Sequence, residues 1–191
     1  MSRRRLPMIA LLAGIALSAC AGTTALGQVG QPGATPSLVA ADPIASWFPA
    51  PMGWASETKG GRGGQIVRVT NLNAEGPGSF RAAVETKGPR IVVFEVGGVI
   101  DLGGKTLRVS EPFLTVAGQT APSPGITLIK GGMDISGHDV IVQHIRIRPG
   151  SAGGTWRKGP DFDSISTVGA YNVVVDHCSL TWGTDETLSA S

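Results

Sequence analysis

Two six-residue stretches decide the fold: Asp139-Val140-Ile141-Val142-Gln143-His144 and Asn172-Val173-Val174-Val175-Asp176-His177, which lie 33 positions apart. Leu114-Thr115-Val116 fits the same pattern 26 positions before Val140-Ile141-Val142. Short β-branched runs that return at irregular periods of about 20–35 residues are typical of a parallel solenoid with loops of unequal length. The sequence therefore predicts stacked coils whose inward Val and Ile side chains form one continuous core.

Further short runs extend the pattern outward from these stretches. They lie between Gly, Pro, Asp and Asn residues, as strands bounded by turns do, and cover residues 65–70, 91–94, 107–109 and 125–129. Such runs are too short for most β-sandwiches. Segment 148–161 would be a long loop inserted between two coils on one face.

Composition excludes several other classes. Glycine and proline make up 41 of the 191 residues, while charged residues make up 16% and aromatic residues 5%. The apolar fraction of 41% is too high for general disorder. The large number of glycines and prolines, which break helices, argues against a helical bundle. One short helix is expected after Ser79, which can cap it, and Gly88-Pro89 follows its end.

The N-terminus has the pattern of an export signal. Residues 1–19 contain three arginines followed by an apolar run, and Leu17-Ser18-Ala19-Cys20 resembles a bacterial lipobox. We expect a signal peptide at 1–19, lipidation of Cys20, a flexible tether at 20–46 and a folded domain at 47–191. The product would be a bacterial cell-surface or outer-membrane lipoprotein, anchored in the membrane through Cys20, or a secreted or periplasmic protein. The alternative is ordinary cleavage, for example after Gly27.

Charge and cysteine content restrict the partners. Removing the signal, with its three basic and no acidic residues, changes the net charge from +2 to −1, which gives no support for nucleic-acid binding. Cys178 is predicted to be a free buried thiol, and a monomer is expected. The cluster Gly60–Gly64 lacks the spacing and the Lys-Ser/Thr of a phosphate-binding loop, so a tight turn is favoured over one.

Acidic residues gather near the end of the sequence. Asp161 and Asp163 precede a predicted strand at 164–166 and would point to one face, because positions i and i+2 of a strand do so. Asp185 lies 22 positions after Asp163, about one solenoid turn, and could complete a carboxylate cluster suited to Ca²⁺. Solvated turn residues are the alternative interpretation.

The three histidines are interpreted as structural. His144 and His177 share one repeat position with each other, and His138 lies nearby. A catalytic pair of Asp176 with His177 is disfavoured, because neighbouring residues of a strand point to opposite faces. No serine lies in a G-x-S-x-G pattern, so a hydrolase triad has no support.

Several ordered stretches resemble the pectate lyase branch of the right-handed parallel β-helix polysaccharide lyases, which includes the pectate trisaccharide-lyases. The resemblance covers about residues 47–191 and rests on Gly60–Gly64, residues 69–83, 88–94, 114–122, 139–150, 172–182 and 184–186. It implies an all-β, right-handed, single-stranded parallel β-helix with a short N-terminal capping helix.

The resemblance also implies a chemistry. Family members cleave polygalacturonate by Ca²⁺-dependent β-elimination, in which an arginine removes the C5 proton and a 4,5-unsaturated sugar results. Asp163 matches the principal Ca²⁺ ligand, Asp161 its partner and Asp185 the first acid of the next coil. The second acid of that coil is replaced by Ser189, which leaves Glu186 as a candidate fourth ligand.

No residue of this sequence matches the catalytic arginine, which the resemblance places on later coils beyond Ser191. We therefore expect the chain to be the N-terminal part of a longer lyase and inactive by itself. Arg157 and Lys158, in the loop beside Asp161, are candidates for contact with the acidic sugar, although solvated loop charges are the alternative. The competing hypothesis for the chain is a non-catalytic surface β-helix protein that binds acidic polysaccharide.

Overall fold

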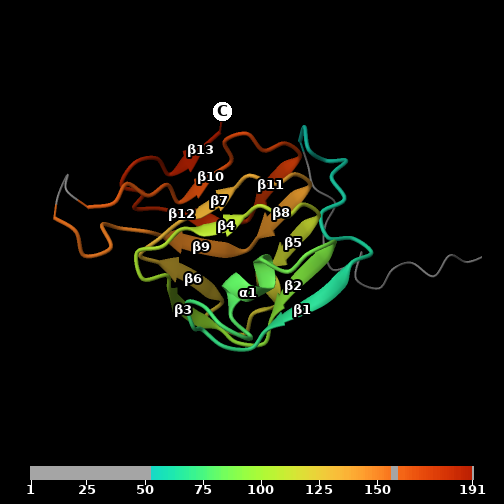
Figure 1. Ribbon diagram of the computed structural model, residues 1–191, viewed down its shortest axis with the longest axis horizontal. Coiled ribbons are helices and arrows are strands. Elements are labelled where there is room, and N and C mark those ends of the chain that lie inside the picture. Colours follow the sequence, from blue (N-terminus) through green and yellow to red (C-terminus); the bar gives the residue numbers. More distant parts are fainter. Residues whose placement is uncertain (1–52, 156–158, 191) are drawn as a thin grey trace, which may run out of the picture. The chain divides into compact units, whose positions relative to one another are not determined.

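Thirteen short strands form three parallel sheets in the computed structural model, which describes residues 53–155 and 159–190. The chain visits the three sheets in turn, so that each circuit is one coil of a parallel β-helix (Figure 1). The predicted fold class is confirmed. The predicted signal at 1–19, Cys20, the tether at 20–46 and the domain start at residue 47 lie outside the described residues.

Twelve of the thirteen strands assign to four coils, and β1 precedes them. Sheet A holds β1 (Gln65–Val69), β2 (Arg90–Phe94), β5 (Leu114–Ala117), β8 (Val140–Gln143) and β11 (Val173–Asp176). Sheet B holds β3 (Gly98–Asp101), β6 (Ile126–Ile129), β9 (Ile145–Arg148) and β12 (Ser179–Leu180). Sheet C holds β4 (Leu107–Val109), β7 (Met133–Ile135), β10 (Ile165–Ser166) and β13 (Leu188–Ser189). We call β2–β4 coil 1, β5–β7 coil 2, β8–β10 coil 3 and β11–β13 coil 4.

The strand register confirms the sequence repeat. Leu114 of β5 pairs with Val140 of β8, and Val140 pairs with Val173 of β11, which reproduces the predicted offsets of 26 and 33 positions. Because the pairing is parallel and in register, equivalent side chains stack along the helix. Inward residues such as Val92, Val116 and Val142 are completely buried, and each is worth about 1.5–3 kcal/mol by burial.

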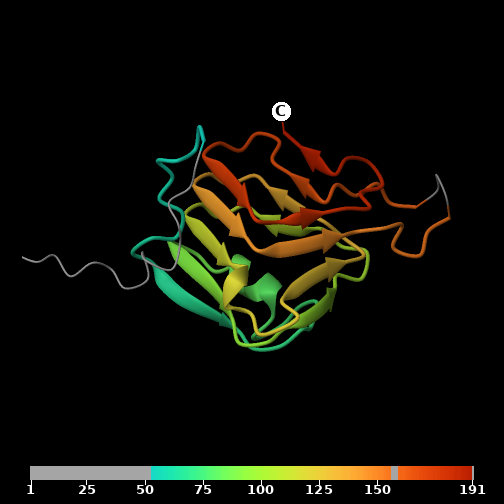
Figure 2. The same ribbon diagram turned by 180° about the vertical axis from the view of Figure 1, so that it is seen from behind.

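A short helix covers the first end of this core. α1 (Phe80–Val84) begins where the Ser79 hydroxyl accepts a hydrogen bond from the Ala82 amide at 3.2 Å. Phe80 packs edge-on against Phe94 of β2, with ring centroids 5.1 Å apart. Figure 2 shows α1 among the early strands, at the end of the stack opposite the C-terminal strands. The capping helix is therefore confirmed.

The glycine cluster packs against the outside of sheet A and makes a turn before β1, as predicted. The Gly61 amide donates to the Thr115 hydroxyl at 2.9 Å, and a Cβ at Gly61 would collide with the Arg90 carbonyl. The short strands β3, β7, β9, β12 and β13 were not predicted. They have only two to four residues each. They are strands because they pair with the neighbouring coil, and not because their own sequence has a long apolar run.

Arg90 ties the capping helix to the first two coils. Its side chain is fully buried, and its guanidinium donates to the carbonyls of Val84, Gly88, Glu111 and Pro112. Burial lowers the pKa of Arg90, and the nearby Glu111 charge opposes this effect. A flat group with five donors can serve several carbonyls at once, which a lysine ammonium cannot do in the same geometry.

We predict that Arg90→Met lowers the free energy of unfolding by at least about 3 kcal/mol, because several buried carbonyls lose their donor. Arg68→Met is the matched control, since Arg68 is an exposed arginine that pairs with Glu95, and it should cost less than about 1 kcal/mol. Urea unfolding of both variants measures the difference. Equal losses would contradict the structural role of Arg90.

Candidate functional site

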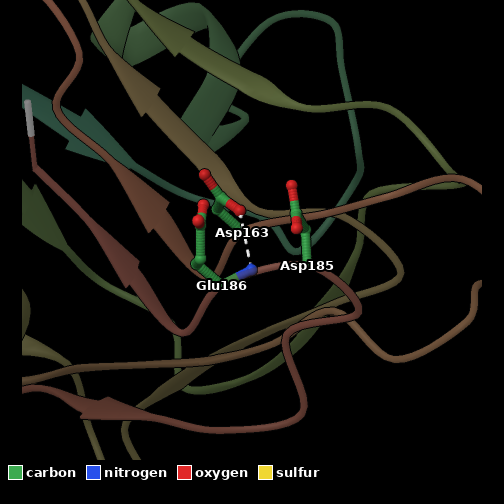
Figure 3. Close-up of side chains that lie close together, drawn as sticks. All are labelled: Asp163, Asp185 and Glu186. Carbon is green, nitrogen blue, oxygen red and sulfur yellow. Dashed lines mark hydrogen bonds between the residues drawn. The ribbon is translucent and has the colours of Figure 1, made fainter.

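Three carboxylates meet where coil 3 and coil 4 lie side by side. One oxygen from each of Asp163, Asp185 and Glu186 lies within 4.8 Å of the other two (Figure 3). Asp163 is half-buried, and the other two are exposed. We call these three residues the acidic cluster.

Strand register explains which residues meet. Ile165 of β10 pairs with Leu188 of β13, an offset of 23 positions, and the adjoining loops continue the same spacing. The Ser164 amide donates to the Glu186 carbonyl at 3.1 Å, and the Glu186 amide donates to the Asp163 carboxylate at 3.0 Å. Glu186, rather than Asp185, is therefore stacked in register with Asp163.

The predicted ligand set is only partly assembled. Asp163, Asp185 and Glu186 come together, whereas Asp161 is not a member of the cluster. The strand expected at 164–166 begins only at Ile165, so the alternation argument does not apply to Asp161 and Asp163. Arg157 and Lys158 lie outside the described residues, and Ser189 is in β13.

The acidic cluster borders a groove of about 460 Å³ on the outer side of sheet C. The groove crosses all four coils, because residues from each of them line it. Its walls come from Thr106, Met133, Asp134, Ser136, Asp161, Phe162, Asp163, Ser166, Val168 and Asp185. Asp161 therefore faces the groove that Asp163 and Asp185 also face.

Two glycines allow the backbones of the cluster to lie where they do. A Cβ at Gly132 would collide with the Asp163 carbonyl oxygen, and one at Gly183 would collide with the Glu186 carbonyl oxygen. Both collisions are with backbone, so a side chain there displaces the loop rather than rotating away. These two positions were not predicted, since in a sequence with many turn glycines nothing shows which glycine packs against another segment's backbone.

The oxygen donors of the cluster fit a hard divalent cation. Carboxylates are the preferred protein ligands of Ca²⁺, which accepts irregular geometry. Three like charges this close repel each other, and a bound cation relieves that repulsion. Asp163, Asp185 and Glu186 are thus the described residues that could hold Ca²⁺.

The histidines occupy the corners of the coils, away from the groove lining. His144 and His177 follow β8 and β11 and stack with centroids 4.8 Å apart, and His138 stacks on Tyr171 at 4.7 Å. The expectation that Asp176 and His177 point apart is wrong, because His177 Nδ1 lies 2.7 Å from the Asp176 carboxylate. The reason is that His177 leaves the strand with a φ of 50°, a left-handed conformation.

Asp176 and Cys178 border this corner. A hydrogen bond from the buried Gln143 amide, together with contact to His177, holds the pKa of Asp176 below its ordinary value, although partial burial opposes this. Burial raises the pKa of the half-buried Cys178 thiol, which favours its less reactive protonated form.

Comparisons with known proteins confirm the predicted resemblance. The chain is 41% identical over 143 residues to a probable pectate lyase C of Aspergillus flavus and 43% identical over 145 residues to that of Emericella nidulans. These matches cover 74% and 75% of this chain but only 32% of each relative. A putative pectate lyase 17 of Arabidopsis thaliana is 34% identical over 152 residues, covering 70% of this chain and 37% of the relative.

The fold has a counterpart among solved structures. Jun a 1, the major allergen from cedar pollen, matches with a TM-score of 0.53 at 24% identity, over 67% of this chain and 41% of that one. No family model matches the chain. The chain spans about a third of the length of the curated relatives it matches.

The relatives overturn the predicted localisation. The prediction of a bacterial cell-surface or outer-membrane lipoprotein is wrong, since the curated relatives are proteins of Aspergillus, Emericella and Arabidopsis, which are eukaryotes. The lipobox resemblance is only four residues long, which is too little to identify the compartment. Among the described residues, no helix has the length and apolar character that a membrane span requires.

We predict that Gly132→Ala weakens Ca²⁺ binding about tenfold or more, because it displaces the backbone of Asp163 and outer-shell changes commonly have this size. Gly97→Ala is the matched control, since its Cβ would collide with the Pro122 carbonyl in the loops that precede β3 and β6, away from the cluster on the sheet C side. Calorimetric Ca²⁺ titration measures both. Equal Ca²⁺ affinities in the two variants would show that Gly132 does not position Asp163.

We also predict that the stabilising effect of Asp176 depends on pH. The pKa of Asp176 is depressed in the folded state, so its contribution is complete above the unfolded value of about 3.9 and disappears as the pH falls through the folded value. Urea unfolding of wild type and Asp176→Asn should show a gap near neutral pH that narrows in strong acid. A gap of constant size from neutral pH to strong acid would contradict the assignment.

Proposed function

We propose that this chain, as a relative of the curated pectate lyases, supplies the Ca²⁺ site and part of the substrate groove of an enzyme that cleaves polygalacturonate by β-elimination. The observation that carries the proposal is the acidic cluster, which opens onto a groove crossing four coils. A long groove suits a polymer, and carboxylates suit a cation that can bridge to an acidic sugar.

The residues of the chain have distinct tasks in this proposal. Asp163, Asp185 and Glu186 hold the cation, and Asp161 lies close enough in the groove to meet the substrate or its counter-ion. When bound, Ca²⁺ would draw electron density from the uronate carboxylate and make the C5 proton more acidic. The backbone bond from Glu186 to Asp163 keeps one carboxylate oxygen oriented, which prepares the site for the cation.

The reaction that the resemblance implies is an elimination, which needs no oxidant or reductant. A base takes the C5 proton, the electron pair forms the C4–C5 double bond, and the C4–O bond breaks. The glycosidic oxygen leaves with the preceding sugar and takes up a proton to become its hydroxyl, and the other product is a 4,5-unsaturated oligogalacturonide. The base, an arginine in the resemblance, has no matching residue in this sequence.

We predict that Asp163→Asn lowers pectate cleavage at least about 100-fold, since even outer partners of metal sites are worth about 10–100-fold. The assay follows the ultraviolet absorbance of the unsaturated product, with the protein expressed from its complete reading frame and with Ca²⁺ present or chelated. Asp101→Asn is the control, because Asp101 is an exposed carboxylate on sheet B that pairs with Lys130.

Two outcomes would contradict this proposal. Cleavage that survives both chelation and Asp163→Asn would remove Ca²⁺ from the mechanism. Pectate binding without any unsaturated product from the complete protein would instead favour the alternative, a non-catalytic β-helix that binds acidic polysaccharide.

A further inference from the structure

The two coils that bear the acidic cluster are joined by one side-chain pair near each of their three corners, two of them ring stacks and the third a cation–π contact. Between sheets C and A, His138 of coil 3 stacks on Tyr171 of coil 4, with centroids 4.7 Å apart and planes 7° apart. Between sheets A and B, His144 stacks on His177 at 4.8 Å and 15°. Between sheets B and C, the Arg148 guanidinium lies 5.6 Å from the Trp182 ring centroid.

The preceding coil interface differs. Among the described residues, the corner contact of this kind between coils 2 and 3 is Phe113 against His138, and that contact is edge-on at 83° rather than stacked. Two ring stacks and a cation–π contact, one near each corner, therefore distinguish the interface between coils 3 and 4. This is the interface across which Asp163 meets Asp185 and Glu186.

The strand pairing between coils 3 and 4 is short, so contacts at the corners contribute to holding these coils together. Sheet A joins coils 3 and 4 through four residue pairs, but β9 pairs with β12, and β10 with β13, through only two each. Three carboxylates within 4.8 Å repel one another on the sheet C side, where the pairing is short. Without a cation, that repulsion acts to separate the two coils.

We propose that the three corner contacts, His138–Tyr171, His144–His177 and Arg148–Trp182, are positioning contacts that hold the acidic cluster assembled before a cation arrives. They set the separation of coils 3 and 4 from all sides, so that binding does not have to draw the carboxylates together against their repulsion. Such pre-organisation appears as affinity rather than as a new contact. The inference rests on the proposed function, because it concerns the cation site of that function.

A buried hydrogen bond supports the same coil separation at the corner between sheets A and B. The buried Gln143 amide donates to the Asp176 carboxylate at 3.0 Å, across the pair formed by β8 and β11. His144 and His177, one residue further on, both have left-handed backbones, with φ of 54° and 50°. Their rings therefore leave the corner in the same direction and meet face to face.

The test is His144→Ala, compared with Phe113→Ala as a matched control. Both residues have a left-handed backbone, φ of 54° and 58°, and both contribute a ring to a corner, but Phe113 joins coils 2 and 3 and meets His138 edge-on rather than as part of the His138–Tyr171 stack. We expect His144→Ala to weaken Ca²⁺ or Tb³⁺ binding by about 3–10-fold and Phe113→Ala to leave it unchanged. Calorimetry and Tb³⁺ luminescence measure affinity, and thermal unfolding is recorded in parallel.

Two further variants keep the proposal testable. His144→Phe retains a ring that can stack and should restore the affinity that His144→Ala loses. Trp182→Ala removes an exposed ring at another corner and should weaken binding to a similar degree even if His144→Ala folds poorly. At one cation concentration, binding should also raise the melting temperature of His144→Ala less than that of the control, because stabilisation by a ligand falls as its affinity falls.

The outcomes separate this inference from the proposed function. If wild type binds neither cation, the proposed Ca²⁺ site is wrong. If wild type binds but His144→Ala and Trp182→Ala retain its affinity while losing stability, the stacks are structural only and the inference is overturned. Failure of His144→Phe to restore affinity would equally overturn it.

Discussion

The in-register parallel stacking of short strands is the constraint on which the rest of this structure depends. Within residues 53–155 and 159–190 no strand exceeds five residues, so none is stable alone, and each exists because its neighbour one coil away satisfies its backbone groups. The same register aligns Val92, Val116 and Val142 into a buried column and places polar residues outside. Arg90 and α1 cover the first end of that column.

The candidate site is a product of the same register. Asp163 and Glu186 are far apart in the sequence, and neither belongs to a strand, yet the pairing of β10 with β13 brings their loops together. The two glycines at 132 and 183 let the neighbouring backbones approach. The cluster therefore has little freedom of its own: its geometry is inherited from the separation of two coils, which is why contacts at the corners of those coils can matter to it.

Much of this organisation could be predicted from the sequence because repeats reveal register. The offsets of 26 and 33 between Leu114, Val140 and Val173 are visible as a pattern and are the offsets of the sheet A pairs. The helix after Ser79 and the pairing of Asp163 with Asp185 follow from local chemistry and from an approximate period. A difference of one position, 22 against 23, decides whether Asp185 or Glu186 stacks on Asp163, and a period read from an irregular repeat is not that fine.

Other features of the site could not be predicted, because they depend on backbone conformations that the residue types do not indicate. His177 leaves its strand in a left-handed conformation, which turns a disfavoured neighbour pair with Asp176 into a 2.7 Å contact. Asp161 falls outside the cluster because the strand that would have aligned it begins later than expected. The predicted bacterial localisation is wrong for a different reason, since the four residues Leu17–Cys20 are weak evidence against relatives that come from fungi and a plant.

The central claim is that a divalent cation binds between coil 3 and coil 4. The most direct measurement is a crystal structure of the protein grown with Tb³⁺ or Ca²⁺, with an anomalous difference map to locate the ion. We expect a peak within coordination distance of Asp163, Asp185 and Glu186, at the edge of the sheet C groove. A map without a peak there, or with the ion bound elsewhere on the chain, would contradict it.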